Sequence, residues 1–119
     1  MYVMRKEEDV DTPNVVTGIF PFLTQSVDVL FDSSATHSFI SAKLIETLGL
    51  DPTQKSSLLT VMLPNGKTVS CEEFYEGYLV KMYECEFPAN LYKFELTDFG
   101  IILGMDWLAK YQAQIDCSK

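Results

Sequence analysis

A barrel-like, mostly-β domain with two short helices is the fold that the sequence predicts. Three observations predict it: short β-prone runs recur along the chain between turn residues, only two segments have helical apolar spacing, and no internal repeat occurs. The chain has 119 residues, of which 47% are hydrophobic and 22% are charged, as is typical of globular proteins. This length supports one hydrophobic core and is too short for two.

Composition and charge exclude several classes of function. The net charge of −8 and the isoelectric point of about 4.4 argue against nucleic acid or an anionic membrane as a partner. No apolar run approaches the roughly 20 residues that span a bilayer, and the first residues do not resemble a signal peptide. Cys71, Cys85 and Cys117 and the one histidine lack the spacing of a zinc site, so no metal or other cofactor is expected. The odd number of cysteines indicates reduced thiols and a cytoplasmic location.

The first third of the chain divides into a lead-in and two strands. Residues 1–14 are rich in charge and predict a flexible acidic lead-in, so the domain is expected at 15–119. Strands are expected at 15–20, where Pro21 marks an end or an edge position, and at 27–32. Side chains alternate along a strand, so Leu30 and Asp32 point to the face opposite Val27 and Val29. A carboxylate at the end of an apolar strand is costly unless hydrogen bonds or a partner stabilise it.

Two segments have the flanking residues and apolar spacing of short helices. Ser38 or Ser41 is expected to cap the first helix, and Gly49 follows it in the position of a left-handed C-terminal cap. The second helix is predicted at 105–111, where Asp106 lies near the positive end of the helix dipole.

The other β-prone runs are separated by a loop, a hairpin turn and prolines. Residues 51–57 are predicted to be a loop, and Asn65-Gly66 is a strong signal for a β-hairpin. Pro88 is expected at a bend or a sheet edge. The predicted strands are at 58–63, 68–71, 78–83, 85–94, 99–104 and 113–117.

Two separated motifs resemble those of a known family. The first, at 31–41, is an apolar run that ends in Asp-Ser-Ser-Ala-Thr, and the second, at 101–108, is Ile-Ile-Leu-Gly-Met-Asp-Trp-Leu. In this order, with the Asn-Gly hairpin between them, the chain resembles the retropepsin-like aspartic protease domain of gypsy-type LTR retrotransposon polyproteins. The resemblance covers roughly 15–117, and the second motif is the more specific of the two.

The resemblance implies a closed retropepsin-like β-barrel that supplies half of a pepsin-type site. Asp32 would be catalytic and would face an open cleft beside the strand at 101–103. Two such aspartates share one proton and activate a water molecule, without a metal or other cofactor. The other Asp-Ser or Asp-Thr pair, Asp11-Thr12, lies in the polar lead-in. The active species would therefore be a symmetric homodimer that cleaves extended polyprotein segments.

The resemblance also implies roles for the residues around Asp32. Ser33 would reach across the dimer axis, and a flap at 64–66 would close over the substrate. His37 would be a polar residue near the rim of the cleft, and Trp107 would pack in the core. The residues that would support the catalytic loop are Ser33, Ser34, Ala35 and Thr36. The residues that would form the flap are Pro64, Asn65 and Gly66, and those that would back the loop are Ile101, Ile102, Leu103 and Gly104.

Ser34 stands where the family has glycine, and this difference leaves an alternative function open. A serine keeps the backbone amide but adds a Cβ and a hydroxyl where two loops approach closely. The alternative is a catalytically inactive remnant that only dimerises or binds peptides. A third hypothesis is an unrelated β-barrel binding module, in which Asp32 is a turn or helix-capping aspartate and Asn65-Gly66 is a plain turn.

Overall fold

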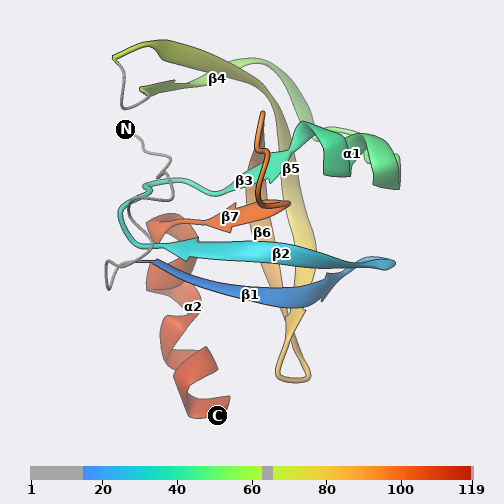
Figure 1. Cartoon of the computed structure of the whole chain (residues 1–119), viewed down its shortest axis with the longest axis vertical. Helices are drawn as coiled ribbons and strands as arrows, with labels where there is room; N and C mark the ends of the chain where they lie inside the picture. Colours follow the sequence, from blue (N-terminus) through green and yellow to red (C-terminus); the bar gives the residue numbers. More distant parts are fainter. Residues whose placement is uncertain (1–14, 63–65, 119) are drawn as a thin grey trace.

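The computed structural model, which describes residues 15–62 and 66–118, is built around one seven-stranded sheet (Figure 1). The strand order is β1-β2-β7-β3-β6-β5-β4, and the hairpin of β4 and β5 lies at the opposite end of the molecule from helix α2. The strands are β1 (Val15–Phe22), β2 (Gln25–Asp32), β3 (Phe39–Ser41), β4 (Gln54–Met62), β5 (Thr68–Met82), β6 (Cys85–Phe94) and β7 (Ile101–Leu103). The helices are α1 (Ala42–Leu48) and α2 (Met105–Ser118). The predicted mostly-β class is confirmed.

The sheet meets itself, as a barrel requires. β1 pairs along its length with β2 and also pairs with β5 through Phe22 and Val80. Strands β1, β2, β7, β3, β6 and β5 therefore form a ring, and β4 extends it as the outer strand of a hairpin. β7 lies between β2, with which it is parallel, and β3, with which it is antiparallel. This arrangement brings the two sequence motifs side by side although they are far apart in the chain.

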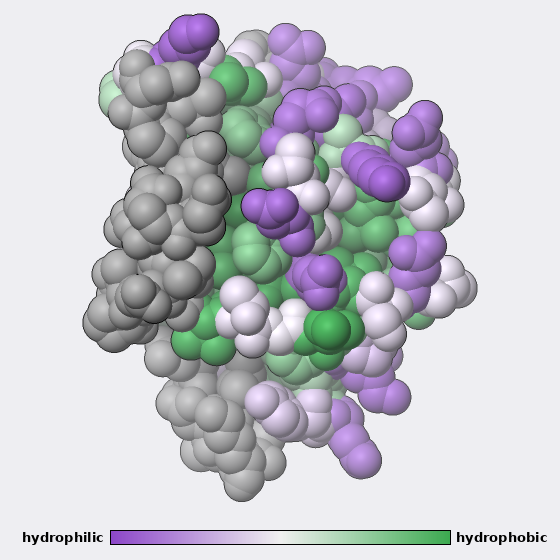
Figure 2. Space-filling model, in the orientation of Figure 1, coloured by the Kyte–Doolittle hydropathy of each residue, from purple (hydrophilic) through white to green (hydrophobic). Residues whose placement is uncertain are grey.

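Both faces of the central strands are buried, in two separate clusters. The larger cluster includes Val29 from β2 and Leu103 from β7. The smaller one includes Leu30, Phe39 and Ile102 together with residues of the β4–β5 hairpin. Alternation along β2 and β7 sends neighbouring side chains into different clusters, as predicted for β2. One face of the molecule shows apolar and hydrophilic side chains interspersed, with hydrophilic ones concentrated along its upper and right margins (Figure 2).

The ends of helix α1 follow the predicted caps. The Ser41 hydroxyl accepts a hydrogen bond from the Leu44 amide at 3.0 Å, so Ser41 is the N-cap rather than Ser38. Gly49 has a φ of 66° and ends the helix in the left-handed conformation, where its amide bonds to the Glu46 carbonyl. No helix of the described residues is long and apolar enough to cross a membrane.

Two strand boundaries differ from the prediction. β4 begins at Gln54, so the last four residues of the predicted loop belong to a strand. β5 is continuous over 15 residues, where the sequence predicts two separate strands. The register of β5 against β6 shifts between Tyr75 and Tyr78, around Gly77 with a φ of 77°. A glycine bulge lets a long strand bend without ending.

The strand predicted at 113–117 is wrong, because α2 continues from Met105 through Ser118. Trp107, Leu108 and Tyr111 pack against the main core, as predicted for Trp107, and their spacing is helical. Each further residue of a helix adds one backbone hydrogen bond within the same segment, whereas a strand needs a neighbouring edge. In the sequence, a short alternation of apolar and polar residues does not distinguish a strand from the continuation of a helix.

Cys71 and Cys85 should differ sharply in reactivity. Cys71 is buried, which raises the pKa of its thiol to about 11, whereas Cys85 is exposed at the β5–β6 turn. Because the thiolate is the reactive form, iodoacetamide at pH 8 should modify Cys85 at least about 100-fold faster than Cys71. Mass spectrometry of the separate peptides measures both rates in the native protein. If both cysteines reacted at the same rate, and Cys71 reacted no faster in urea than in the native protein, the burial of Cys71 would be contradicted.

Candidate active site

Asp32 is the last residue of β2 and lies beside the second motif. Its neighbour Phe31 pairs with Leu103 of β7, and Asp32 itself pairs with Val15 of β1. The Ala35 amide donates to the Asp32 carbonyl at 3.1 Å and closes the turn that follows the strand. The side chain of Asp32 has an exposed fraction of 0%. The expectation of a carboxylate facing an open cleft is therefore wrong for this conformation of the single chain.

The two carboxylate oxygens of Asp32 have different surroundings. Oδ1 accepts a hydrogen bond from the Ser34 amide at 2.9 Å and a second from the Ser34 hydroxyl at 2.6 Å. Oδ2 is buried and has no hydrogen-bond partner among the residues that the structure describes. A buried carboxylate oxygen without a partner is destabilising, and such groups concentrate at functional sites. The site is thus satisfied on one oxygen and incomplete on the other.

The other residues of the predicted catalytic loop differ in their exposure to solvent. Ser33 and Thr36 are exposed, and Ala35 is buried. The Thr36 hydroxyl lies 2.9 Å from Nδ1 of His37, whose ring packs edge-on against Tyr92 with the centroids 5.6 Å apart. His37 is therefore engaged by Thr36 and Tyr92, at the outer part of the loop.

Gly104 fixes the distance between the second motif and the catalytic loop. A Cβ at this position would lie 2.4 Å from the carbonyl oxygen of His37 and 2.7 Å from that of Ala35. The neighbouring Met105 amide donates to the same Ala35 carbonyl at 2.8 Å. Ile101, Ile102 and Leu103, which precede Gly104, are all buried. The catalytic loop is therefore bonded to the backbone of Met105 and leaves no space for a side chain at Gly104.

A buried hydroxyl joins the loop to helix α2, and sequence reasoning missed this contact. The Ser38 hydroxyl donates to Oδ1 of Asp106 at 2.7 Å and accepts from the Gly104 amide at 3.0 Å. Ser38 is fully buried, and in the sequence it is one of two candidate helix caps. The serine and the aspartate are 68 residues apart, so no local pattern relates them. The only sequence signal is that Asp106 follows the glycine of the second motif.

The predicted flap is described in part. Pro64 and Asn65 lie outside the described residues, and Gly66 has a φ of 90°. Met62 pairs with Thr68, so the predicted hairpin is formed by β4 and β5. Val61, which precedes Met62 at the turn end of the hairpin, and Cys71 of β5 pack in the smaller cluster with Leu30, Phe39 and Ile102. Since Leu30 and Asp32 share a face of β2, the turn half of the hairpin lies on the face of the sheet to which Asp32 belongs.

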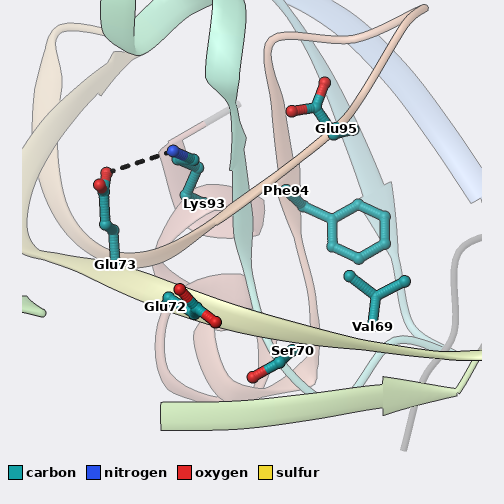
Figure 3. A pocket seen from close by; sticks show the side chains of 7 residues that line it. All are labelled: Val69, Ser70, Glu72, Glu73, Lys93, Phe94 and Glu95. Atoms are coloured by element: carbon teal, nitrogen blue, oxygen red, sulfur yellow. Dashed lines mark ion pairs between the residues drawn. The ribbon is translucent and has the colours of Figure 1, made fainter. Parts of the chain in front are cut away.

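A separate cavity of about 370 Å³ opens between β5 and the end of β6 (Figure 3). Its charged side chains include Glu73 and Lys93, which form an ion pair at 3.6 Å. The Tyr75 hydroxyl donates to Glu73 at 2.6 Å and lowers the pKa of that carboxyl. The cavity is lined by Val69, Ser70, Glu72, Glu73, Lys93, Phe94 and Glu95, and Asp32 is not among these residues.

Metal binding has no visible basis in the part of the chain that the structure describes. No three His, Cys, Asp or Glu side chains gather there as a group that could hold a metal ion.

Solved structures with the same fold are viral proteases and a related domain. The retroviral protease-like domain of Ddi1 from Leishmania major matches with a TM-score of 0.64 and 17% identity, over 83% of this chain and 78% of that one. EIAV protease in complex with the inhibitor HBY-793 matches with a TM-score of 0.63 and 16% identity, over 86% of this chain and 92% of that one. The foamy viral protease-reverse transcriptase in complex with an RNA/DNA hybrid matches with a TM-score of 0.57 and 12% identity, over 83% of this chain and 12% of that one.

Sequence comparison assigns the family. A search of curated protein sequences found no match. The sequence profile described as retroviral aspartyl protease matches residues 1–119, the whole chain. The fold likeness to EIAV protease agrees with this match and confirms the predicted retropepsin-like architecture. The chain belongs to the retroviral aspartyl protease family.

Proposed function

We propose that this chain is an aspartic endopeptidase that hydrolyses peptide bonds as a symmetric homodimer, with Asp32 as its catalytic residue. The observation that carries the proposal is the asymmetry of the buried Asp32 carboxylate. Oδ1 accepts two hydrogen bonds, and Oδ2 is buried without a partner in the described ranges 15–62 and 66–118. Membership of the retroviral aspartyl protease family supports the same reaction class.

A second copy of the chain supplies what Oδ2 lacks. Two Asp32 carboxylates that meet on a two-fold axis share one proton, because like charges at that separation do not both ionise. The shared proton gives each Oδ2 a hydrogen-bonded neighbour and removes most of the cost of its burial. Ser33, which is exposed next to Asp32, would contact the partner's loop.

The reaction follows from the shared proton. The ionised carboxyl takes a proton from a water molecule held between the two aspartates, and this water attacks the scissile carbonyl carbon. The protonated carboxyl donates its proton to the carbonyl oxygen, so a tetrahedral intermediate forms without a covalent bond to the protein. The proton belongs to the pair and not to one residue. Backbone contacts from Gly104 and Met105 to Ala35 hold the loop in place, and the flap at 64–66 would exclude water.

The proposed substrate is an extended peptide segment, such as a junction between units of a gypsy-type retrotransposon polyprotein. Sites of this kind bind a chain between a flap and a catalytic floor. The packing of the β4–β5 hairpin against Leu30 of β2 supports a role for this hairpin as the flap. The free thiols of Cys71 and Cys85 support a reducing location such as the cytoplasm.

One observation favours a second candidate function. Asp32 is fully buried in the single chain, so substrate could reach it only if the loop or its surroundings change on dimerisation. If that change does not occur, the domain would dimerise or bind peptides without cleaving them.

Fluorogenic peptides of extended sequence test the proposal, with the oligomeric state of the same samples measured by sedimentation. We expect cleavage at mildly acidic pH, inhibition by pepstatin and activity that rises with the dimer fraction. A dimer that binds pepstatin and cleaves none of a diverse peptide library would establish the non-catalytic function instead. A chain that neither dimerises nor binds pepstatin would contradict both.

Acidification should strengthen the dimer. Two chains of charge −8 repel each other, and bringing two Asp32 carboxylates together makes association take up a proton. A reaction that takes up a proton is favoured as pH falls, so the dimer dissociation constant should decrease from pH 7 toward about 5. Sedimentation equilibrium across this range measures the change. Asp32→Asn, which cannot take up the proton, should show a weaker pH dependence, and a wild-type dimer that loosens on acidification would contradict the prediction.

A further inference from the structure

We propose that the Ser34 hydroxyl positions the Asp32 carboxylate. Ser34, which stands where the family has glycine, is then part of the catalytic arrangement. The proposal rests on the proposed function of Asp32. It assigns to the serine side chain a role that a glycine in its place could not have.

The hydrogen bonds of Ser34 define the orientation of the carboxyl group. Its amide and its hydroxyl both donate to Oδ1 of Asp32, at 2.9 and 2.6 Å, and the hydroxyl contact has the short length typical of a bond to a charged acceptor. With both donors on one oxygen, rotation about the Cβ–Cγ bond of Asp32 would break two bonds at once. Oδ2 is therefore held in the direction of the expected partner.

The backbone at Ser34 accommodates a side chain without strain. Among the described residues other than glycine, a positive φ occurs at Leu23, Tyr83 and Glu84, and Ser34 is not among them. A glycine is thus not required here by backbone conformation. The side chain is half-buried and turned toward Asp32 of its own chain, so its hydroxyl is directed at the carboxylate.

The consequence for the reaction is a more precisely held dyad. Misplacement of a reacting group by about 1 Å can lower a rate about 100-fold. The amide of Ser34 alone would hold Oδ1 by a single bond, and the hydroxyl adds a second that acts before substrate binds. Removing the hydroxyl should therefore lower kcat about tenfold, the loss expected for one hydrogen bond to a charged group. KM should change less than about twofold, because Ser34 acts through Asp32 and not on the substrate.

Three substitutions at Ser34 separate the hydroxyl from side-chain bulk. Ser34→Ala keeps the Cβ and removes the hydroxyl, Ser34→Gly removes both, and Ser34→Thr keeps the hydroxyl. We expect kcat to fall about tenfold in the alanine and glycine variants and to return to within about twofold of wild type in the threonine variant. Ser26→Ala, at an exposed position of β2 beside the β1–β2 turn, is the matched serine control and should leave kcat unchanged. Thermal unfolding of each variant confirms that it is folded.

Wild-type kcat in Ser34→Ala, or higher kcat in Ser34→Gly than in wild type, would overturn the positioning role. A spectroscopic readout keeps the test independent of the proposed enzymatic function. The ¹³C signal of the Asp32 carboxyl, assigned by its loss in Asp32→Asn, should move in Ser34→Ala and stay near its wild-type position in Ser34→Thr. Coincident signals in wild type and Ser34→Ala would overturn the proposal even in a chain without activity. Loss of cleavage in all forms, with the signal still shifted in Ser34→Ala, would refute the proposed function alone.

Discussion

Asp32→Asn is expected to lower kcat for peptide cleavage by at least about 1,000-fold. An amide neither takes a proton from water nor gives one to the scissile carbonyl, so the variant loses both proton transfers. The fold should survive, because the oxygen of the introduced amide can still accept both hydrogen bonds from Ser34. Replacing a buried charged group by a neutral one should leave the unfolding temperature unchanged or higher. Steady-state kinetics and thermal unfolding measure the two effects.

Asp28→Asn is the matched control for this variant. Asp28 lies on the same strand and is exposed, so its substitution removes one negative charge without touching the buried carboxylate. We expect its kcat to remain within about twofold of wild type. Full activity in Asp32→Asn would refute Asp32 as the catalyst. A large and equal loss in both variants would mean that charge, and not the position of Asp32, controls the rate.

Gly104→Ala should lower the free energy of unfolding by about 3 kcal/mol, the upper part of the range for overpacking a buried site. The added Cβ would lie 2.4 and 2.7 Å from two backbone carbonyl oxygens, of His37 and Ala35. Backbone atoms cannot move aside as a flexible side chain can, so the catalytic loop must shift as a unit. Equilibrium unfolding in urea measures the loss. In the dimer the same shift should also reduce kcat, since Asp32 begins this loop.

Gly77→Ala is the control that separates the cost of a steric clash from the cost of an unfavourable backbone conformation. Gly77 has a φ of 77° and no atom within 4 Å of the added Cβ, so its substitution introduces strain but no clash. The expected cost is about 1 kcal/mol, with no effect on kcat. Gly104 has the opposite character: its φ is not in the left-handed region, and only space forbids a side chain. Equal losses in the two variants would contradict the close contact between Gly104 and the catalytic loop.

Local patterns in the sequence determined much of the fold. Alternation predicted which side chains of β2 face each way, Asn65-Gly66 predicted the β4–β5 hairpin, and Gly49 predicted the end of α1. These features depend on residues within a few positions of one another, so their physics is contained in a short segment. The order of the two motifs also predicted the family, which the profile match confirms. The roles of Asp32 and its neighbours stay predictions.

Tertiary structure decided the features that depend on what surrounds a residue. The bulge at Gly77 joins two predicted strands into one, because β6 offers a continuous edge to pair with. Residues 113–117 are helical and not a strand, because a helix completes its own hydrogen bonds whereas a strand needs an open edge beside it.

The candidate site shows the same division between sequence and structure. The sequence identified Asp32 as a carboxylate in need of a partner, and it identified Ser34 as a departure from the family. It could not determine where the Ser34 hydroxyl points, because a serine side chain bonds to whichever acceptor the folded loop brings near. Nor could it relate Ser38 to Asp106, whose contact exists only once β7 lies between β2 and β3. The sequence determines which residue types occur and in what order, whereas the choice of hydrogen-bond partner depends on the packed surroundings.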